Sequence, residues 1–399
     1  MQLDLIYFDA GGGHRASATA LKAVIEQQGR PWSVRMVNLR EILDPNDRFR
    51  RTIGMGVEEG YNRFIAKGWT WGAPAGLKML QGSIALAHRL MVRRLAHYWE
   101  QTKPDMVVSL VPNFDRALYD GLKAAAPQVP FVTLLTDFAD HPPHFWIEKG
   151  QKQSFICGTE KAVQQARQLG HAEEAIYATS GMIMRPHFYN PVAVERAVER
   201  QKLGLNPAQP TGLVLFGGSG SKVMATIAKR LGDTQLIMIC GNNAALADKL
   251  RAMPSNAPHH IVGFTNEVPY YMQLADFFIG KPGPGSISEA VHMRLPVIVV
   301  SNRQTLPQER YNATWVKEHK VGIVLKHFRD VRKAVTALTT DLATYRAQTA
   351  KINNRAVFEI PDILARIFQR SAAENCAPLQ APAEPVSTRA ALPAKALTQ

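Results

Sequence analysis

Short apolar strands that end in glycine-rich turns occur three times along this chain of 399 residues. The three segments are LDLIYFDAGGG (3–13), GLVLFGGSGS (212–221) and FFIGKPGPGS (277–286). A helical pattern follows each turn, with Leu21 and Ile25 on one face after the first. A strand that passes through a glycine turn into a helix is the building unit of parallel α/β folds. The sequence therefore predicts an α/β protein.

The same strand and helix alternation fills both halves of the chain, whose length suits two domains of ordinary size. Further strands are expected at Met106–Leu110, Phe131–Leu135, Ser154–Cys157, Ala175–Ala178, Leu236–Cys240, His260–Val262 and Pro296–Val300. The expected division is an N-terminal domain (1–180), a linker (181–193), a C-terminal domain (194–355), a C-terminal helix (356–371) and a disordered tail (372–399). The linker contains two prolines, and the tail is rich in Ala and Pro with almost no large apolar residues.

The charge balance and the cysteines point to a basic cytosolic protein. Lys and Arg total 47 and Asp and Glu total 33, a net charge of +14, which is often attractive to nucleic acid or to anionic lipid headgroups. No apolar run reaches the roughly 18 residues that a membrane-spanning helix needs, and we expect no secretory signal at the N-terminus. The three cysteines form no CxxC pair, which is typical of a reducing cytosol.

Residues 48–99 differ in composition from the rest of the chain. Arg48, Arg50 and Arg51 precede the segment GYNRFIAKGWTWGAPAG (60–76), and a basic helix is expected from Leu77 to Trp99. Its apolar stripe consists of Leu80, Ile84, Ala87, Leu90, Met91 and Leu95, and Trp69, Trp71 and Trp99 lie near its ends. A basic amphipathic segment flanked by Trp is typical of a membrane interface. An ordinary core helix with a solvated basic face stays open as the alternative, while nucleic acid is disfavoured because aromatic residues are not interleaved with the charges.

The glycine turns of the second half suit a diphosphate, because glycine lets a ligand approach the backbone and a helix N-terminus offers free N–H groups. Neither Gly11–Gly13 nor Gly217–Ser221 matches GxGxxG or the P-loop pattern. Glu289 allows two interpretations. It either forms a capping box with Ser286, or it accepts hydrogen bonds from the hydroxyls of a ribose.

Six segments, taken in order, resemble one family. They are FDAGGGHRASA (8–18), TDFADHPPHFW (136–146), FGGSGSK (216–222), VGFTNEV (262–268), GKPGPGSISEA (280–290) and PQERYN (307–312). The resemblance covers about residues 4–370 and is to the monogalactosyldiacylglycerol synthases and processive diacylglycerol glucosyltransferases. More distantly, the chain is similar to the lipid-linked N-acetylglucosaminyltransferase of peptidoglycan synthesis. The resemblance implies a GT-B fold, in which two Rossmann-like domains face a cleft, the first for the acceptor and the second for the nucleotide sugar.

The resemblance also implies roles for individual residues. His14 matches the catalytic base, and Phe264 falls where the main chain holds uracil. Gly217, Gly218, Ser219, Gly220 and Ser221 match the first diphosphate loop, and Gly285 and Ser286 match the second. Glu289 matches the carboxylate that binds the ribose, and Gln308 and Glu309 match the residues that bind the sugar hydroxyls. The glycine that often precedes the Gln-Glu pair is absent from LPQERYN, and this departure bears on which sugar is used.

The cluster Asp137, Asp140, His141 and His144 allows three interpretations. Two carboxylates and two imidazoles within eight residues can bind a divalent metal, although the two intervening prolines extend the backbone and the side chains need not converge. The resemblance places the loop at the cleft, where Asp137 or His141 can act on the substrate, and a structural role is the third interpretation. We predict Asp137 as a second catalytic residue and no metal.

These observations predict an inverting glycosyltransferase that moves galactose or glucose from a UDP-sugar to the hydroxyl of diacylglycerol. His14, at the start of a helix whose N-terminus disfavours imidazolium, takes the acceptor proton. The UDP-sugar is a substrate, so no cofactor is expected. The expected partners are the lipid acceptor and an anionic membrane surface, with the protein cytoplasmic and peripheral on the inner face of the cell membrane. Alternatives are transfer of N-acetylglucosamine or glucose to another lipid-linked acceptor, a UDP-N-acetylglucosamine 2-epimerase of the same fold, and a non-enzymatic nucleotide-binding module.

Overall fold

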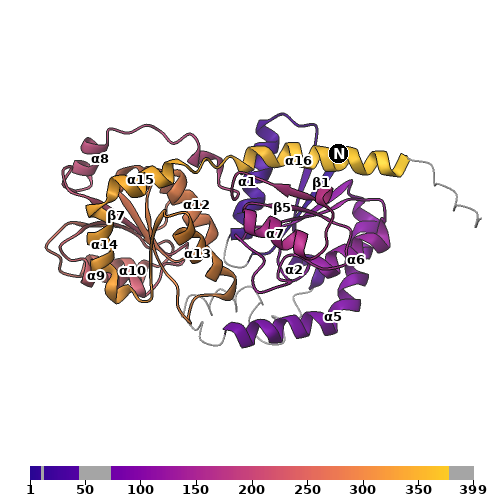
Figure 1. The fold of residues 1–399 in the computed structure, drawn as a ribbon, viewed down its shortest axis with the longest axis horizontal. Helices are drawn as coiled ribbons and strands as arrows, with labels where there is room; N and C mark the ends of the chain where they lie inside the picture. Colours follow the sequence, from indigo (N-terminus) through magenta and orange to yellow (C-terminus); the bar gives the residue numbers. More distant parts are fainter. Residues whose placement is uncertain (10–12, 45–72, 377–399) are drawn as a thin grey trace, which may run out of the picture.

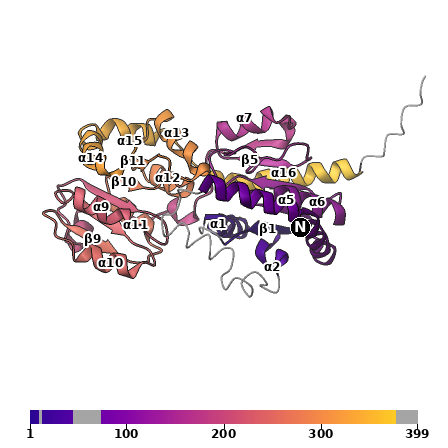
Figure 2. The same cartoon turned by 90° about the horizontal axis from the view of Figure 1, so that it is seen from below.

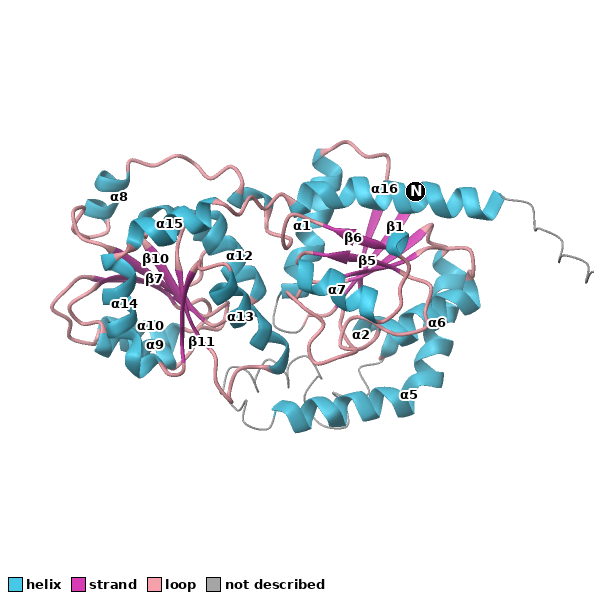
Figure 3. Ribbon diagram, viewed as in Figure 1, coloured by secondary structure: helices cyan, strands magenta, loops and turns pink. Residues whose placement is uncertain are grey.

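Two parallel six-stranded sheets, each covered by helices on both faces, make up the protein (Figures 1 and 3). The computed structural model describes residues 1–9, 13–44 and 73–376. Three of the features predicted around the basic helix, namely Arg48 to Arg51, Trp69 and Trp71, lie outside the described residues, as do 377–399 of the predicted tail. Among the described residues, none of the helices has the length and apolar character that crossing a membrane requires.

The first sheet has the strand order β2-β1-β3-β4-β5-β6. Its strands are β1 Gln2–Tyr7, β2 Ser33–Asn38, β3 Met106–Ser109, β4 Phe131–Leu134, β5 Ser154–Cys157 and β6 Ile176–Ala178. Its helices are α1 Gly13–Gln27, α2 Leu39–Leu43, α5 Ala73–Thr102, α6 Asp115–Ala125 and α7 Glu160–Gln168, with the 3-10 turn η2 Glu173–Ala175. Neighbouring residues of a strand point to opposite faces, so Leu5 packs into the core on one side and Ile6 into the core on the other.

The second sheet has the order β12-β11-β10-β7-β8-β9. Its strands are β7 Thr211–Leu215, β8 Gln235–Ile239, β9 His259–Val262, β10 Phe277–Gly280, β11 Val297–Val300 and β12 Gly322–Leu325. Its helices are α8 Arg196–Lys202, α9 Val223–Arg230, α10 Ala244–Arg251, α11 Val268–Leu274, α12 Pro284–His292, α13 Arg310–Glu318, α14 Val331–Thr340 and α15 Leu342–Ala350, with the 3-10 turns η3 Pro186–Phe188, η4 Pro307–Glu309 and η5 Phe328–Asp330. The edge strand β12 was not predicted from the sequence, although three of its four residues are apolar; all four are only partly buried.

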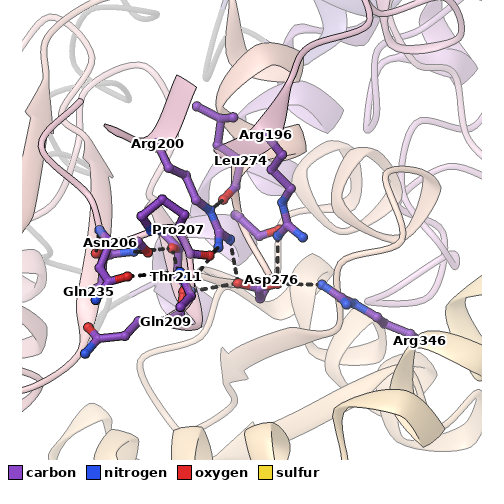
Figure 4. Close-up of polar contacts among 12 residues, drawn as sticks. Arg196, Arg200, Asn206, Pro207, Gln209, Thr211, Gln235, Leu274, Asp276 and Arg346 are labelled. Carbon is purple, nitrogen blue, oxygen red and sulfur yellow. Dashed lines mark hydrogen bonds and ion pairs between the residues drawn. The ribbon is translucent and has the colours of Figure 1, made fainter. Parts of the chain in front are cut away.

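A buried ion network fixes the amino end of β10 (Figure 4). Asp276 accepts from the guanidinium groups of Arg196 (2.7 Å), Arg200 (2.6 Å) and Arg346 (2.7 Å). It also accepts from the backbone N–H of Thr211 at 2.8 Å. Burial acts to raise the pKa of Asp276, but the Thr211 N–H and the arginines outweigh it and hold the pKa below its usual value. The network ties α8, β7 and α15 together at the sheet edge opposite the glycine turns.

The C-terminal helix α16 (Ala356–Cys376) leaves the second sheet and returns to the first (Figures 1 and 2). Its buried side chains Ile360, Ile363, Leu364 and Ile367 belong to the same core as Leu3 and Leu5 of β1. The helix continues five residues beyond the predicted end at 371. The N-terminal sheet is therefore completed by the last helix of the chain.

Candidate functional site

A cavity of about 690 Å³ lies between the two halves of the protein and is lined by loops and helices of both. The N-terminal half contributes the start of α1, the β3–α6 loop and the loop after β4, with His14 and Asp137 among the lining residues. The C-terminal half contributes the first turns of α12 and the turn η4, with Gly285, Ser286 and Glu289 among them. His14 and Glu309, which are 295 positions apart in the sequence, thus face one space.

His14 is the second residue of α1 and points into this cavity. Its Nδ1 lies 3.1 Å from the Thr136 hydroxyl, and its ring centroid is 6.0 Å from that of Trp146. Burial lowers the pKa of His14 to about 4, although a contact with the Leu110 backbone opposes the shift. The imidazole is therefore neutral at neutral pH, as the sequence predicts. Burial is the largest cause of the lowered pKa, and the predicted contribution of the helix N-terminus stays a prediction.

Asp137 lies three residues after β4 and is only 7% exposed. The indole Nε1 of Trp146 donates to its Oδ2 at 3.0 Å. Burial raises the pKa of Asp137 to about 7, Glu309 raises it further, and the hydrogen bond from Trp146 and the charge of Lys281 oppose the rise. Near neutral pH the Asp137 carboxyl group is therefore present in both its protonated and its ionised form. It lines the same cavity as the neutral imidazole of His14.

The other members of the predicted acidic and histidine cluster do not join Asp137. The Asp140 carboxylate accepts from the backbone N–H groups of Trp146 (2.7 Å) and His144 (2.9 Å), so it holds the shape of its own loop. His141 is not among the residues that line the cavity. In the part of the chain that the structure describes, no group of three or more His, Cys, Asp or Glu side chains is arranged to hold a metal ion.

On the donor side, the loop after β10 runs into α12, which begins at Pro284 with Gly283 as its N-cap. Gly285 and Ser286 lie in the first turn, where backbone N–H groups have no partner within the helix. The capping-box interpretation of Ser286 is wrong. Because the helix begins two residues earlier, Ser286 is its third residue and no side chain caps the end.

Glu289 therefore has no capping role and lies in the cavity wall, with 14% of its side chain exposed. Its Oε1 lies 3.4 Å from Nη2 of Arg185, a residue of the predicted linker that also lines the cavity. Burial raises the pKa of Glu289 to about 7, and the charge of Arg185 and its hydrogen bond oppose the rise. Among the residues that the structure describes, Arg185 is the cation that pairs with this carboxylate.

Gln308 and Glu309 lie in the turn η4 and line the same cavity. Nζ of Lys281 donates to Oε1 of Glu309 at 2.8 Å. Glu309 is 7% exposed, so the lysine neutralises a charge that would otherwise be costly to bury. This contact joins the turn η4, which carries the predicted sugar-binding residues Gln308 and Glu309, to the loop that follows β10.

The glycine turn Gly217–Ser221 follows β7, and β7 pairs directly with β10. Gly217 and Gly220 have φ of 77° and 59°, a conformation that side chains other than glycine rarely adopt. This turn and Phe264, which follows β9 and is 63% exposed, lie at the carboxyl edge of the second sheet but outside the cavity lining. The structure thus gathers most of the predicted site residues in one cavity and leaves these two groups beside it. Their roles in nucleotide binding stay predictions.

Among the cavity-lining residues that the sequence did not predict are Thr136, Lys281 and Arg185. Thr136 had a signal, since it comes directly after a predicted strand, at the sheet edge where ligands bind in open α/β folds. Lys281 stands inside a predicted loop. Arg185 gave no signal, because a residue in a proline-containing linker is not expected at a nucleotide site.

The two halves of the chain match two different family models. Residues 14–182 match the family model of monogalactosyldiacylglycerol (MGDG) synthase. The N-terminal half is thus similar to MGDG synthases. Residues 213–367 match the glycosyltransferase family 28 C-terminal domain. The family resemblance predicted from the six segments is therefore confirmed.

Curated MGDG synthases are similar to the chain over most of its length. It is 27% identical over 357 residues to the chloroplastic monogalactosyldiacylglycerol synthase of Spinacia oleracea, covering 83% of this chain and 65% of that protein. It is 28% identical over 351 residues to monogalactosyldiacylglycerol synthase 1 of Arabidopsis thaliana, covering 83% of this chain and 63% of that protein. The chain thus spans just under two thirds of the length of these relatives.

Solved structures show the fold. MurG of Acinetobacter baumannii superposes with a TM-score of 0.56 at 12% identity, covering 92% of this chain and 99% of MurG. A UDP-GlcNAc 2-epimerase of Neisseria meningitidis, bound to UDP-GlcNAc, gives a TM-score of 0.56 at 13% identity and covers 93% of this chain. The α/β fold with two facing Rossmann-like halves, GT-B, is as predicted. Since a transferase and an epimerase share it, the fold alone does not choose between these activities.

Proposed function

We propose that the protein is an inverting glycosyltransferase that moves a hexose, galactose or glucose, from a UDP-sugar to the hydroxyl of diacylglycerol or a related lipid. The observation that carries this proposal is the composition of the cavity. One wall holds a neutral His14 and a proton-exchanging Asp137, and the facing wall holds the first turn of α12 with Glu289. The match of residues 14–182 to the MGDG synthase model supports a glycerolipid acceptor.

An apolar region of the same cavity suits the acyl part of the acceptor. It is formed by Phe8, Phe114, Leu77, Leu80, Phe145 and Met184. Phe8 and Phe114 stack with their ring centroids 6.0 Å apart. A cavity with an apolar wall and a few converging polar groups is typical of a small-molecule site. Here the apolar wall belongs to the half that carries His14, which is where an acceptor lipid has to lie.

The reaction follows from this arrangement. The acceptor oxygen attacks the anomeric carbon of the sugar and passes its proton to His14 as the new C–O bond forms. The bond from the anomeric carbon to the diphosphate oxygen breaks, and UDP leaves with the electron pair. Attack from the face opposite UDP inverts the anomeric configuration, so an α-linked donor gives a β-glycoside. Asp137 acts as a second acid–base group beside the acceptor.

The charge that develops on UDP needs stabilisation, which backbone N–H groups supply without a cofactor. In this proposal Gly285 and Ser286, with the turn Gly217–Ser221, hold the diphosphate at helix N-termini. The backbone near Phe264 holds uracil, Glu289 accepts from the ribose hydroxyls, and Gln308 and Glu309 contact the sugar.

Helix α5 supports a membrane surface as the place of reaction. Its C-terminal part is an ordinary core helix, with Leu95 and Trp99 buried, so the interfacial role predicted for Trp99 is wrong. Its N-terminal part exposes Met79 (78%), Leu86 (91%) and Leu90 (51%). Leu77 and Leu80 in the same part of the helix line the cavity, so the helix that carries the exposed apolar residues also borders the acceptor side of the site. The net charge of the whole protein is +14, which favours binding to an anionic surface. We take this surface to be the inner face of the cell membrane.

The test is to incubate the full chain with anionic vesicles that contain diacylglycerol and with a panel of UDP-sugars. The proposal expects UDP release that depends on the lipid, together with a hexosyl lipid detected by mass. Transfer of N-acetylglucosamine, or glycosylation of only another lipid acceptor, would replace the diacylglycerol assignment. Conversion of UDP-N-acetylglucosamine to its 2-epimer without any lipid would establish the epimerase instead. Vesicle binding with no UDP release would leave a non-enzymatic module.

A further inference from the structure

We infer that Arg185 is a positioning residue for the donor, which holds the Glu289 carboxylate in the orientation that the ribose hydroxyls of a uridine nucleotide require. This inference rests on the function proposed above and adds to it a residue outside the six family-like segments. Arg185 belongs to the segment between β6 and α8, which passes from the first sheet to the second.

Arg185 is held from behind. It is the N-cap residue of η3, and its guanidinium lies over the ring of Phe188, 5.1 Å from the centroid. Phe188 is 1% exposed and belongs to the core of the second sheet. A planar guanidinium packed against a fixed ring loses little further freedom when it binds a carboxylate. Arg185 therefore presents its Nη2 to the cavity in a restricted orientation.

Glu289 needs this partner. Among the described residues, Arg185 is the one ion-pair partner that Glu289 has, at 3.4 Å. The other charged groups of the cavity wall do not take its place, since Lys281 pairs with Glu309 and the remaining side chains, Asp137 and His14, offer no cation. Burial favours the protonated carboxyl, and Arg185 opposes it. An ionised carboxylate with a fixed plane accepts two hydroxyl hydrogen bonds, and charged hydrogen bonds are the stronger ones.

The same geometry raises a competing role. A guanidinium on the cavity wall can also bind the diphosphate directly, and both roles would weaken nucleotide binding if Arg185 were lost. The two roles differ in the part of the ligand on which the loss depends. A positioning role through Glu289 acts on the ribose hydroxyls, whereas direct contact acts on the phosphates.

The experiment therefore compares how protein variants bind two nucleotides that differ only in the ribose hydroxyls. Calorimetric titration measures the affinity of each pair. UDP and 2′,3′-dideoxy-UDP, which lacks both ribose hydroxyls, are titrated into the wild-type full chain, Arg185→Gln, Arg185→Lys and Glu289→Gln. Arg251→Gln, from an exposed pair on α10, is the matched control for loss of a positive charge. Circular dichroism melting checks that each variant is folded, and Arg185→Lys carries the test if Arg185→Gln is not.

We expect Arg185→Gln to weaken UDP binding by about 10-fold to 100-fold, the usual range for one hydrogen bond to a charged group. The same variant should leave the affinity for dideoxy-UDP unchanged, and Arg185→Lys should lie between wild type and Arg185→Gln. Adding Arg185→Gln to Glu289→Gln should produce no further loss. An equal loss for both nucleotides, or none for either, overturns the inference while the proposed function stands. A wild-type chain that binds no UDP overturns the proposed function itself.

Discussion

His14 and Asp137 carry opposite charges when ionised, yet burial pushes both toward the neutral form. The pKa of the imidazole falls to about 4 and that of the carboxyl rises to about 7, because removal from water disfavours the charged state of either group. At neutral pH the cavity therefore holds a base without its proton beside an acid that exchanges one. This combination suits removal of a proton from a neutral hydroxyl.

The first prediction concerns His14. Replacement by Gln should lower kcat in the vesicle assay by roughly 10²-fold to 10⁴-fold, the usual worth of a general base, and leave UDP affinity unchanged. In the wild-type protein, loss of the base should appear only as the pH falls toward 4, where the imidazole takes a proton. His97→Gln, on the exposed part of α5, is the control and should keep full activity. Full activity in His14→Gln would remove the base assignment.

The second prediction concerns the stability that Asp137 costs. Its pKa is about 7 in the folded state and near 3.8 when unfolded, so the folded state binds more protons between these values and stability falls as pH rises through this window. Asp137→Asn keeps an oxygen for the Trp146 indole and removes the charge. It should raise the free energy of unfolding at pH 8 by up to about 4 kcal/mol and leave it unchanged near pH 4.

Denaturant unfolding at the two pH values measures this difference. Asp248→Asn, at an exposed position of α10, is the control and should change stability little at either pH. Equal stability of Asp137→Asn and wild type at pH 8 would mean that the carboxyl group is not held in an unfavourable environment.

At this scale, sequence reasoning found the residues at the ends of strands and missed their partners. His14 lies at the start of α1 and Asp137 follows β4, which their local sequences show, whereas Glu289 lies inside α12. Thr136 meets His14 across 122 positions and Arg185 meets Glu289 across 104, so nothing local in the sequence signals either contact. The error over Ser286 has another cause. Proline and glycine at 284 and 285 are compatible with a helix start, and the sequence does not fix which residue begins it.

Among the elements, α12 and the amino end of β10 show how the proposed donor side is held in place. The loop that carries Gly285 and Ser286 leaves the carboxyl end of β10, while Asp276 anchors the other end of the same strand. The three arginines around Asp276 come from α8 and α15. Arg196 of α8 lies 80 positions before Asp276 in the sequence, and Arg346 of α15 lies 70 positions after it. A strand fixed at one end provides a defined starting point for a binding loop at the other.

The third prediction tests this anchor. Asp276→Asn leaves three guanidinium groups without a countercharge, one of them, Arg200, nearly fully buried. Removing one partner from a buried ion network costs about 3–5 kcal/mol, so a loss of this size is expected in denaturant unfolding. Arg346→Gln should cost less, since its side chain is 37% exposed and two arginines remain. A loss below that of Arg346→Gln would show that the network contributes little.

The fourth prediction concerns the exposed apolar face of α5. Met79→Ser with Leu86→Ser removes two exposed side chains, so folding stability should not change. Because burying each such side chain in a bilayer interface contributes about 1.5–3 kcal/mol when complete, binding to anionic vesicles should weaken by about tenfold or more. Co-sedimentation with vesicles measures it. Val192→Ser with Val198→Ser removes two exposed apolar side chains elsewhere and should bind as wild type does. Equal binding by all three proteins would exclude α5 as the membrane contact.

Across the whole molecule, the two halves are joined by more than the linker. The cavity takes its walls from both sheets, and α16 runs from the second sheet back onto the first (Figure 2). The two parallel sheets were predictable because buried parallel strands form continuous apolar runs between glycine turns. The packing of α16 was not, because an apolar stripe such as Ile360, Ile363 and Leu364 shows that a helix covers a core but not which core.

The fifth prediction follows from that crossing. Leu364 is fully buried in the core of the first sheet although it comes after the entire second sheet in sequence. Leu364→Ala should cost about 2–5 kcal/mol, the usual range for a core cavity. Hydrogen exchange should show lost protection in β1 and β3 before β7 and β8. Leu250→Ala, equally a buried leucine but in the core of the second sheet, should give the reverse pattern. If Leu364→Ala instead exposed β7 and β8 first, α16 would stabilise the half it comes from, and the first sheet would fold without it.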